Sequence, residues 1–219
     1  MKVADSLFAF LWTDTGSNNA NTYLIRGTKN ILVDPGHFHH FGYVRERLSS
    51  MSMAAEDIDL VVLTHGHPDH MEGIQAFSGS SALISLHPVE FRFIKDFALQ
   101  YGAVPGLSEF QPSFLLQEGE LRVDDKVFQV LHSPGHSPGS LCLYWAEKKA
   151  LFSGDVIFQQ GLGRTDLPGG NGDQLKESIR RLSRLDVEIL LPGHGQIVLG
   201  KERVRRNFEE VENMWFGYI

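Results

Sequence analysis

Four short apolar segments of this chain each end in a turn that carries histidine or aspartate. The segments are typical of buried β-strands and cover Leu60–Leu63, Val127–Leu131, Leu151–Ser153 and Ile189–Leu191. The turns after them read Thr64-His65-Gly66-His67-Pro68-Asp69-His70, His132-Ser133-Pro134-Gly135-His136-Ser137-Pro138-Gly139, Gly154-Asp155 and Pro192-Gly193-His194-Gly195. In the first turn, Pro68 suits the first position of a helix. His65 and His67 then stay in the turn, so this loop can point four ligating groups into one small volume.

The donor atoms of these turns favour metal ions. Imidazole nitrogens and carboxylate oxygens without thiolates suit zinc, iron or manganese. A single histidine in a turn is usually solvated or caps a helix, whereas four titratable groups at one strand end cost stability without a cation. The six or seven candidate ligands exceed what one tetrahedral ion needs. The set therefore predicts two adjacent ions, about 3.5–4 Å apart.

Strand-like and helix-like segments alternate along the rest of the chain. Further apolar runs cover Leu7–Trp12, Thr22–Arg26, Asn30–Asp34, Ala82–Leu86 and Leu141–Trp145. Helical spacing predicts helices around 44–51, 88–101, 175–185 and 204–215, with Gly172-Asp173 as the cap of the third. A loop with Pro and Gly follows the second helix through Pro112. The mixture predicts sheets covered by helices, of class α/β or α+β, and no repeat or linker marks a domain boundary.

Composition excludes several classes of protein. The 20 Lys and Arg against 27 Asp and Glu give a formal net charge of -7, which argues against nucleic acid as a partner. Cys142 is the only cysteine, so neither a disulfide within the chain nor a thiolate zinc cage can form. We expect it to be a buried strand residue. No signal peptide is evident, and no apolar run approaches the ~18 residues of a membrane span. We therefore expect a cytoplasmic protein that acts on a small molecule without a membrane partner.

The order of the turns resembles the metallo-β-lactamase superfamily. The resemblance rests on Thr-His-Gly-His-Pro-Asp-His, the later Pro-Gly-His, Ser-Gly-Asp and Pro-Gly-His turns, and the early Val33-Asp34-Pro35-Gly36 turn. It implies an α+β fold, an αββα sandwich of two mixed sheets flanked by helices. The expected domain is 1–219, with a helical insertion around 88–112 and a short C-terminal helix. The resemblance also implies one metal on His65, His67 and His136, a second on Asp69, His70 and His194, and Asp155 bridging them. Zinc is the first expectation for both divalent ions, with iron or manganese as alternatives.

The loop Gly161-Leu162-Gly163-Arg164-Thr165-Asp166-Leu167-Pro168-Gly169-Gly170, followed by Asn171, narrows the resemblance to glyoxalase II-like hydrolases. The resemblance to these enzymes implies hydrolysis of a 2-hydroxyacyl thioester such as S-lactoylglutathione through a metal-bridging hydroxide. It also implies Asp69 and Asp155 as catalytic residues. Full-length glyoxalase II enzymes carry a larger C-terminal helical region than residues 196–219 provide. The identity of the thiol therefore stays open.

Several residues and activities keep more than one interpretation. Asp34 is expected to accept the outer N–H of a ligating histidine, or else to form the turn before Pro35. Arg164 could bind a substrate carboxylate or lock its loop against Asp166, while His37, with the neighbouring His39 and His40, could contact substrate or be solvated. An alternative enzyme is a persulfide dioxygenase with a single Fe(II) on His65, His136 and Asp155. Lactone hydrolysis and a non-catalytic metal-binding role are the remaining alternatives.

Overall fold

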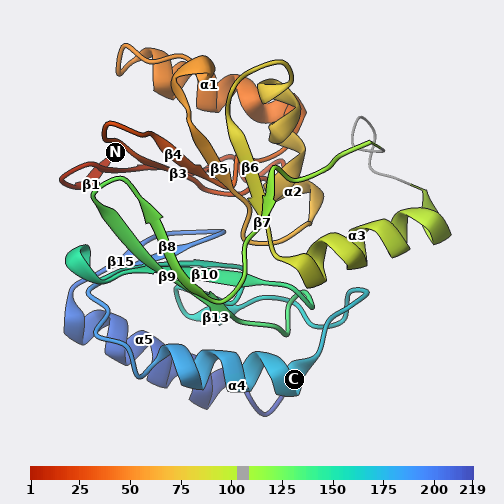
Figure 1. Ribbon diagram of the computed structural model, residues 1–219. Coiled ribbons are helices and arrows are strands. Elements are labelled where there is room, and N and C mark those ends of the chain that lie inside the picture. The colour runs from red at the N-terminus through yellow and green to blue at the C-terminus, as the bar shows by residue number, and fades with distance from the viewer. Residues whose placement is uncertain (103–108) are drawn as a thin grey trace.

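Two β-sheets pack face to face between outer layers of helices in the computed structural model, which describes residues 1–102 and 109–219 (Figure 1). Helix α1 covers one outer face, and α4 and α5 cover the other. The αββα sandwich of two mixed sheets expected from the sequence is confirmed. Within the described residues, no helix combines the length and apolarity needed to cross a membrane.

The first sheet has the order β1-β2-β3-β4-β5-β6-β7. Its first four strands pair antiparallel, and β4 to β7 pair parallel. The strands are β1 (Lys2–Ala4), β2 (Leu7–Phe10), β3 (Thr22–Ile25), β4 (Ile31–Val33), β5 (Leu60–Val62), β6 (Leu83–Leu86) and β7 (Phe114–Leu115). The helical segments between them are η1 (Phe38–His40), α1 (Phe41–Ser49), η2 (Ala55–Asp57), α2 (Pro68–Met71), η3 (Glu72–Phe77) and α3 (Pro88–Tyr101).

The second sheet has the order β15-β14-β11-β10-β9-β8. Only the β11–β14 pair is parallel among its described strands. The strands are β8 (Gly119–Val123), β9 (Lys126–His132), β10 (Leu141–Trp145), β11 (Ala150–Gly154), β14 (Ile189–Pro192) and β15 (Val198–Leu199). A small hairpin of β12 (Ile157–Phe158) and β13 (Gly161–Leu162) follows β11, and the helical segments are η4 (Ala146–Lys148), α4 (Gly172–Leu182) and α5 (Lys201–Trp215).

The apolar runs are continuous because both faces of each sheet are covered. Tyr23 and Ile25 of β3 face the core between the sheets, while Leu24 packs in the core under α1. In β10, Leu143 likewise faces the core between the sheets, and Cys142 packs in the core under α4 and α5. Alternating side chains of one strand thus enter two different cores, which hides the period-two pattern of a half-exposed strand. Cys142 is buried, and burial raises the pKa of its thiol to about 12.

The predicted cap of α4 is wrong by one residue. Asn171, and not Gly172-Asp173, occupies the N-cap, where its side-chain oxygen accepts a hydrogen bond from the Gln174 backbone N–H at 3.0 Å. Asparagine suits this position because its short side chain reaches the free N–H groups of the first turn. The loop predicted after the second helix falls partly on 103–108, outside the described residues. Helix α3 itself forms as predicted, with Pro88 in its first turn.

Candidate metal centre

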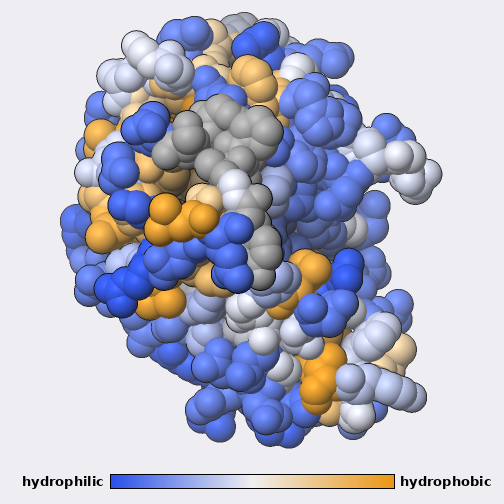
Figure 2. All heavy atoms as spheres, turned by 90° about the vertical axis from the view of Figure 1, so that its right-hand side faces the viewer, coloured by the Kyte–Doolittle hydropathy of each residue, from blue (hydrophilic) through white to orange (hydrophobic). Residues whose placement is uncertain are grey.

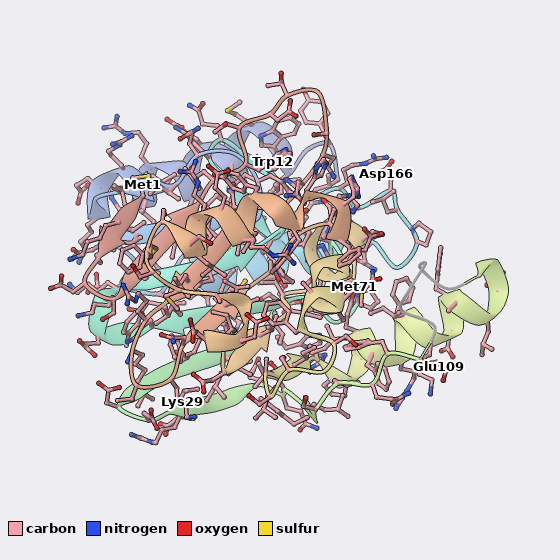
Figure 3. The ribbon with its side chains drawn as sticks, turned by 90° about the horizontal axis from the view of Figure 1, so that it is seen from above. Met1, Trp12, Lys29, Met71, Glu109 and Asp166 are labelled. Atoms are coloured by element: carbon pink, nitrogen blue, oxygen red, sulfur yellow. The ribbon has the colours of Figure 1, made fainter. Side chains whose placement is uncertain are left out.

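The loops after β5, β9, β11 and β14 meet at one end of the sandwich, the end where α3 lies. Pro68 begins α2, as predicted, so Asp69 and His70 fall in this short helix while His65 and His67 precede it. His136, Asp155 and His194 come from the other three loops. Viewed from above, Met71 and Asp166 lie at the same end as α3, and Met1 and Lys29 lie at the other (Figure 3). Four separate segments thus deliver seven donor side chains to one place.

His65, His67 and His136 form the first group of donors. His65 Nε2 lies 3.1 Å from His67 Nδ1 and 3.2 Å from His136 Nε2, and the remaining pair is 2.9 Å apart. Three nitrogens bound tetrahedrally to Zn²⁺ at about 2.0–2.1 Å would be about 3.3 Å from one another. The observed triangle is slightly smaller than this and has the same shape. The three imidazoles therefore fit a single cation.

Asp69, His70 and His194 form the second group. His194 Nε2 lies 3.3 Å from His70 Nε2 and 3.2 Å from Asp69 Oδ2. Asp155 lies between the two groups, with Oδ1 3.2 Å from His70 Nε2 and Oδ2 3.4 Å from His194 Nε2. The same Oδ2 is 3.5 Å from His136 Nε2 in the first group. This carboxylate is placed to contact a cation in either group or to span both.

Asp34 supports two of the histidines, His70 directly and His65 through Thr64. Its Oδ2 accepts a hydrogen bond from His70 Nδ1 at 2.9 Å and another from the Thr64 hydroxyl at 2.7 Å. The Thr64 oxygen in turn lies 3.1 Å from His65 Nδ1 and can accept its proton. With the proton on Nδ1, Nε2 of a neutral His65 or His70 would present a lone pair to a cation. Burial opposes protonation of His70, but Asp155, Asp34 and Asp69 outweigh it and raise the pKa of this imidazole, so a cation bound there would displace a proton. The structure thus gives Asp34 the contact expected of it.

Burial and mutual charge set the protonation of the donors. Burial, followed by the neighbouring histidines, lowers the pKa of His67 to about 4. Burial opposes protonation of His194, but Asp155 and Asp69 outweigh it and raise the pKa of that imidazole to about 9. Burial would also raise the pKa of both carboxyl groups, yet the neighbouring histidines, His70 first, hold it below the usual range. Ionised carboxylates and a neutral His67 are the forms that bind metal ions.

Comparison with known proteins agrees with this geometry. The family model described as the metallo-beta-lactamase superfamily matches residues 15–194. The chain belongs to this superfamily. It is a metallo-hydrolase, and its His/Asp groups are of the kind that hold divalent metal ions.

One curated protein and two solved structures are similar to this superfamily member. A hydroxyacylglutathione hydrolase from Haemophilus influenzae is 34% identical over 78% of this chain and 83% of its own length. A crystal structure of a protein in a di-iron-bound form is 33% identical, with a TM-score of 0.68 over 82% of this chain and 89% of that one. A metallo-β-lactamase family protein from Thermus thermophilus shares the fold, with a TM-score of 0.79, 24% identity and coverage of 95% and 78%.

Glu90 is a residue of this metallo-hydrolase that the sequence interpretation missed. It is buried in the first turn of α3 and accepts hydrogen bonds from the backbone N–H groups of Gly66 at 2.9 Å and Gly139 at 2.7 Å. It also accepts a hydrogen bond from the Ser137 hydroxyl. One carboxylate thus holds the loop of His65 and His67 against the loop after β9. An acidic residue in the first turn of a helix is common, so nothing in the sequence marks this one.

Asn18 is a second residue that sequence reasoning missed. Its Nδ2 donates a hydrogen bond of 2.6 Å to Asp69 Oδ2, the oxygen that also faces His194. Asn18 lies 51 residues before Asp69 and contributes to the wall of the cavity over the centre. Only the tertiary structure shows this contact, because no spacing relates the two residues.

Arg164 and His37 occupy different surroundings. Arg164 lines the cavity over the centre. Its carbonyl oxygen accepts a hydrogen bond from His136 Nδ1 at 2.8 Å, and its guanidinium forms an ion pair with Asp166 at 2.7 Å. His37 is not among the described residues that line this cavity, and its Nδ1 lies 2.7 Å from Glu72 Oε2. His37, His39 and Glu72 form another group whose donor atoms could meet on a cation. The centre of the His40 ring lies 4.6 Å from that of the Trp12 ring, and the two planes are tilted by 40°.

Proposed function

We propose that this metallo-hydrolase cleaves thioesters of 2-hydroxy acids, with S-lactoylglutathione as the first substrate to test. The observation that carries the proposal is the division of the donors into two groups with Asp155 between them. Such an arrangement supports two divalent ions, with His65, His67 and His136 as ligands of one and Asp69, His70 and His194 as ligands of the other. Zinc is the first candidate, and iron and manganese suit the same donors.

Divalent ions at these positions would lower the pKa of a bound water toward about 7 and stabilise negative charge on a substrate oxygen. The chain's own groups would orient the reactants. Asp69 and Asp155 line a cavity of about 560 Å³ over the centre, and both carboxylates are ionised hydrogen-bond acceptors for an attacking water. Asn18 fixes Asp69 in position. A thiol leaving group with a pKa of about 8.5 needs little help from a general acid, which is consistent with the absence of Lys or Tyr among the described residues that line this cavity.

The loop of residues 161–170 supports the glyoxalase II-like branch. Its residues Leu162, Gly163, Arg164 and Leu167 line the cavity over the centre. The similarity to a hydroxyacylglutathione hydrolase supports the same branch. Arg164 is paired with Asp166, so we assign it to holding the loop in shape and not to binding a substrate carboxylate.

Turnover of S-lactoylglutathione by metal-loaded protein tests the proposal. His67→Ala and Asp155→Ala each remove a proposed ligand, and we expect both to abolish release of the thiol. Asp173→Ala is the matched control for Asp155→Ala, because the Asp173 side chain is 97% exposed and belongs to none of the groups whose donor atoms could meet on a cation. Full turnover in both ligand variants would end the proposal.

Metal counting separates this activity from the persulfide dioxygenase alternative. Two ions in each chain and no oxygen consumption support hydrolysis, since Asp69, His70 and His194 then have a role as ligands. One iron in each chain, with oxygen consumed in the presence of a glutathione persulfide, would support the alternative.

A further inference from the structure

A second cavity of about 300 Å³ lies beside the metal centre. Helix α3 and the two residues Leu167 and Pro168 contribute to its walls. His67, Pro68 and Leu167 line both this cavity and the one over the centre, so the two adjoin at a proposed metal ligand. Figure 2 faces this end of the molecule and shows hydrophobic side chains at the surface among hydrophilic ones.

The walls of the second cavity are apolar. Its lining includes Met71, Phe91, Ile94, Ala98, Phe110 and Leu167. Among the described lining residues, Lys95 alone carries a fixed charge, and its Nζ lies 5.4 Å from the centre of the Phe91 ring. A glutathione or nucleotide group needs several charged or hydrogen-bonding partners, and besides Lys95 the described walls offer only the polar side chains of His67 and Gln111. An aliphatic chain needs none and gains free energy by leaving water.

The cavity is built into the same framework as the centre. Ile94 packs so closely on Gly66 that a Cβ at this glycine would lie 2.2 Å from Ile94 Cδ1. One turn earlier in α3, Glu90 accepts the hydrogen bond of the Gly66 N–H. The helix that forms the apolar wall is therefore fixed directly to the loop that carries His65 and His67. A chain bound along this wall would reach the centre in a defined register.

We propose that the second cavity binds the acyl chain of the thioester substrate. The inference rests on the proposed function and extends it: the preferred acyl group continues beyond the 2-hydroxy carbon as an aliphatic chain, longer than lactoyl. In the reaction, water adds its oxygen to the thioester carbon, the carbon–sulfur bond breaks, and the products are a carboxylic acid and a free thiol. The acyl chain lies in the apolar cavity, and the polar thiol extends from the open side of the centre.

A series of straight-chain 2-hydroxyacyl thioesters of N-acetylcysteamine, from lactoyl to 2-hydroxydecanoyl, tests this inference while the thiol stays constant. Each buried methylene contributes about 0.8 kcal/mol, so kcat/KM should rise about fourfold per methylene until the cavity is full. Ala98→Trp places a large side chain in the cavity and should flatten this dependence. Leu99→Trp adds the same side chain at the neighbouring position, which is 87% exposed, and should keep the dependence.

A binding measurement separates the failure of this inference from that of the proposed function. Calorimetry of metal-loaded protein should show octanoate binding more tightly than butyrate, by about fourfold for each added methylene that is buried. Ala98→Trp should remove the difference, with circular dichroism confirming that both tryptophan variants fold. Hydrolysis without chain-length dependence, or equal effects of the two variants, overturns the inference and leaves the hydrolase intact. If neither this series nor S-lactoylglutathione is cleaved, the proposed function fails, and equal binding of octanoate and butyrate would overturn the acyl site as well.

Discussion

Replacing Glu90 by glutamine tests whether helix α3 holds the metal centre together. The Glu90 side chain is buried, and its two oxygens accept three hydrogen bonds, from Gly66, Ser137 and Gly139. Gly66 lies between two proposed ligands, and Ser137 directly follows a third. Glutamine has nearly the same shape as glutamate, so the substitution removes one charge and one acceptor without opening a cavity.

The magnitude follows from the three hydrogen bonds. In its better orientation the amide oxygen keeps the bonds to Ser137 and Gly139, and the amide nitrogen faces the Gly66 N–H. The unpaired, partly buried N–H costs about 1–3 kcal/mol, and the loss of charge assistance in the other two bonds costs about 2–3 kcal/mol together. Burying a neutral amide requires less desolvation free energy than burying a carboxylate, which offsets part of this cost. We expect the free energy of unfolding to fall by about 2–4 kcal/mol.

Urea unfolding of the metal-free protein measures this change, and competition with a chelator measures metal affinity. We expect a lower urea midpoint with an unchanged slope, and a metal affinity reduced about 10–100-fold because the ligand loops lose their support. Glu46→Gln, at an exposed position of α1, is the matched control and should stay within about 0.5 kcal/mol of the parent. A Glu90→Gln protein with parental stability and metal affinity would refute the reasoning.

Three further predictions follow from the centre and its surroundings. Gly193→Ala places a Cβ 2.1 Å from Asp155 Oδ1 and should reduce the number of bound metal ions, whereas Gly42→Ala, with no atom within 4 Å of its Cβ, should leave the number unchanged. Chelation should lower the melting temperature, because ligand at a thousandfold excess over its Kd stabilises the fold by about 4 kcal/mol; readdition of metal should restore it. Burial and the stacked His132 lower the pKa of His87 to about 4. The unfolded chain therefore binds this proton first, and stability should fall as the pH drops from about 6.5 to 4. Urea midpoints across this range should decline less in His87→Phe, and an equal decline would contradict the assignment.

The sequence predicts the strands near the centre well because each is a continuous apolar run that ends in a turn. The run Leu141–Trp145 coincides with β10, and Thr22–Arg26 exceeds β3 by one residue. Most strands that escaped prediction, such as β1, β7 and β15, have two or three residues and are partly exposed. Strand β8 also escaped prediction; it has five residues, none of which is buried. Their hydrogen bonds to neighbouring strands define them, and hydrophobic patterning does not. Periodicity likewise could not choose the topology: the resemblance supplied the sandwich of two sheets, and the structure gives the order of the strands.

The candidate site shows the same division between local and tertiary information. The donor residues of the four turns were visible because their residue types and crowding are unusual in a stable chain without a cation. Glu90 and Asn18 were not visible, since each is an ordinary residue until the fold places it beside a ligand loop. Glu90 becomes important because α3 crosses Gly66, and Asn18 because the loop after β2 passes over Asp69.

Asp34 supports a proposed ligand through an unusual backbone conformation. The sequence allowed it either to form the turn before Pro35 or to support a ligating histidine. Residues 34–37 have no assigned turn, but the Asp34 backbone has φ +51°, a left-handed conformation that aspartate tolerates better than most side chains. Its buried carboxylate accepts hydrogen bonds from the backbone N–H and hydroxyl of Thr64 and from His70 Nδ1. The backbone conformation is therefore what brings the carboxylate within reach of the histidine.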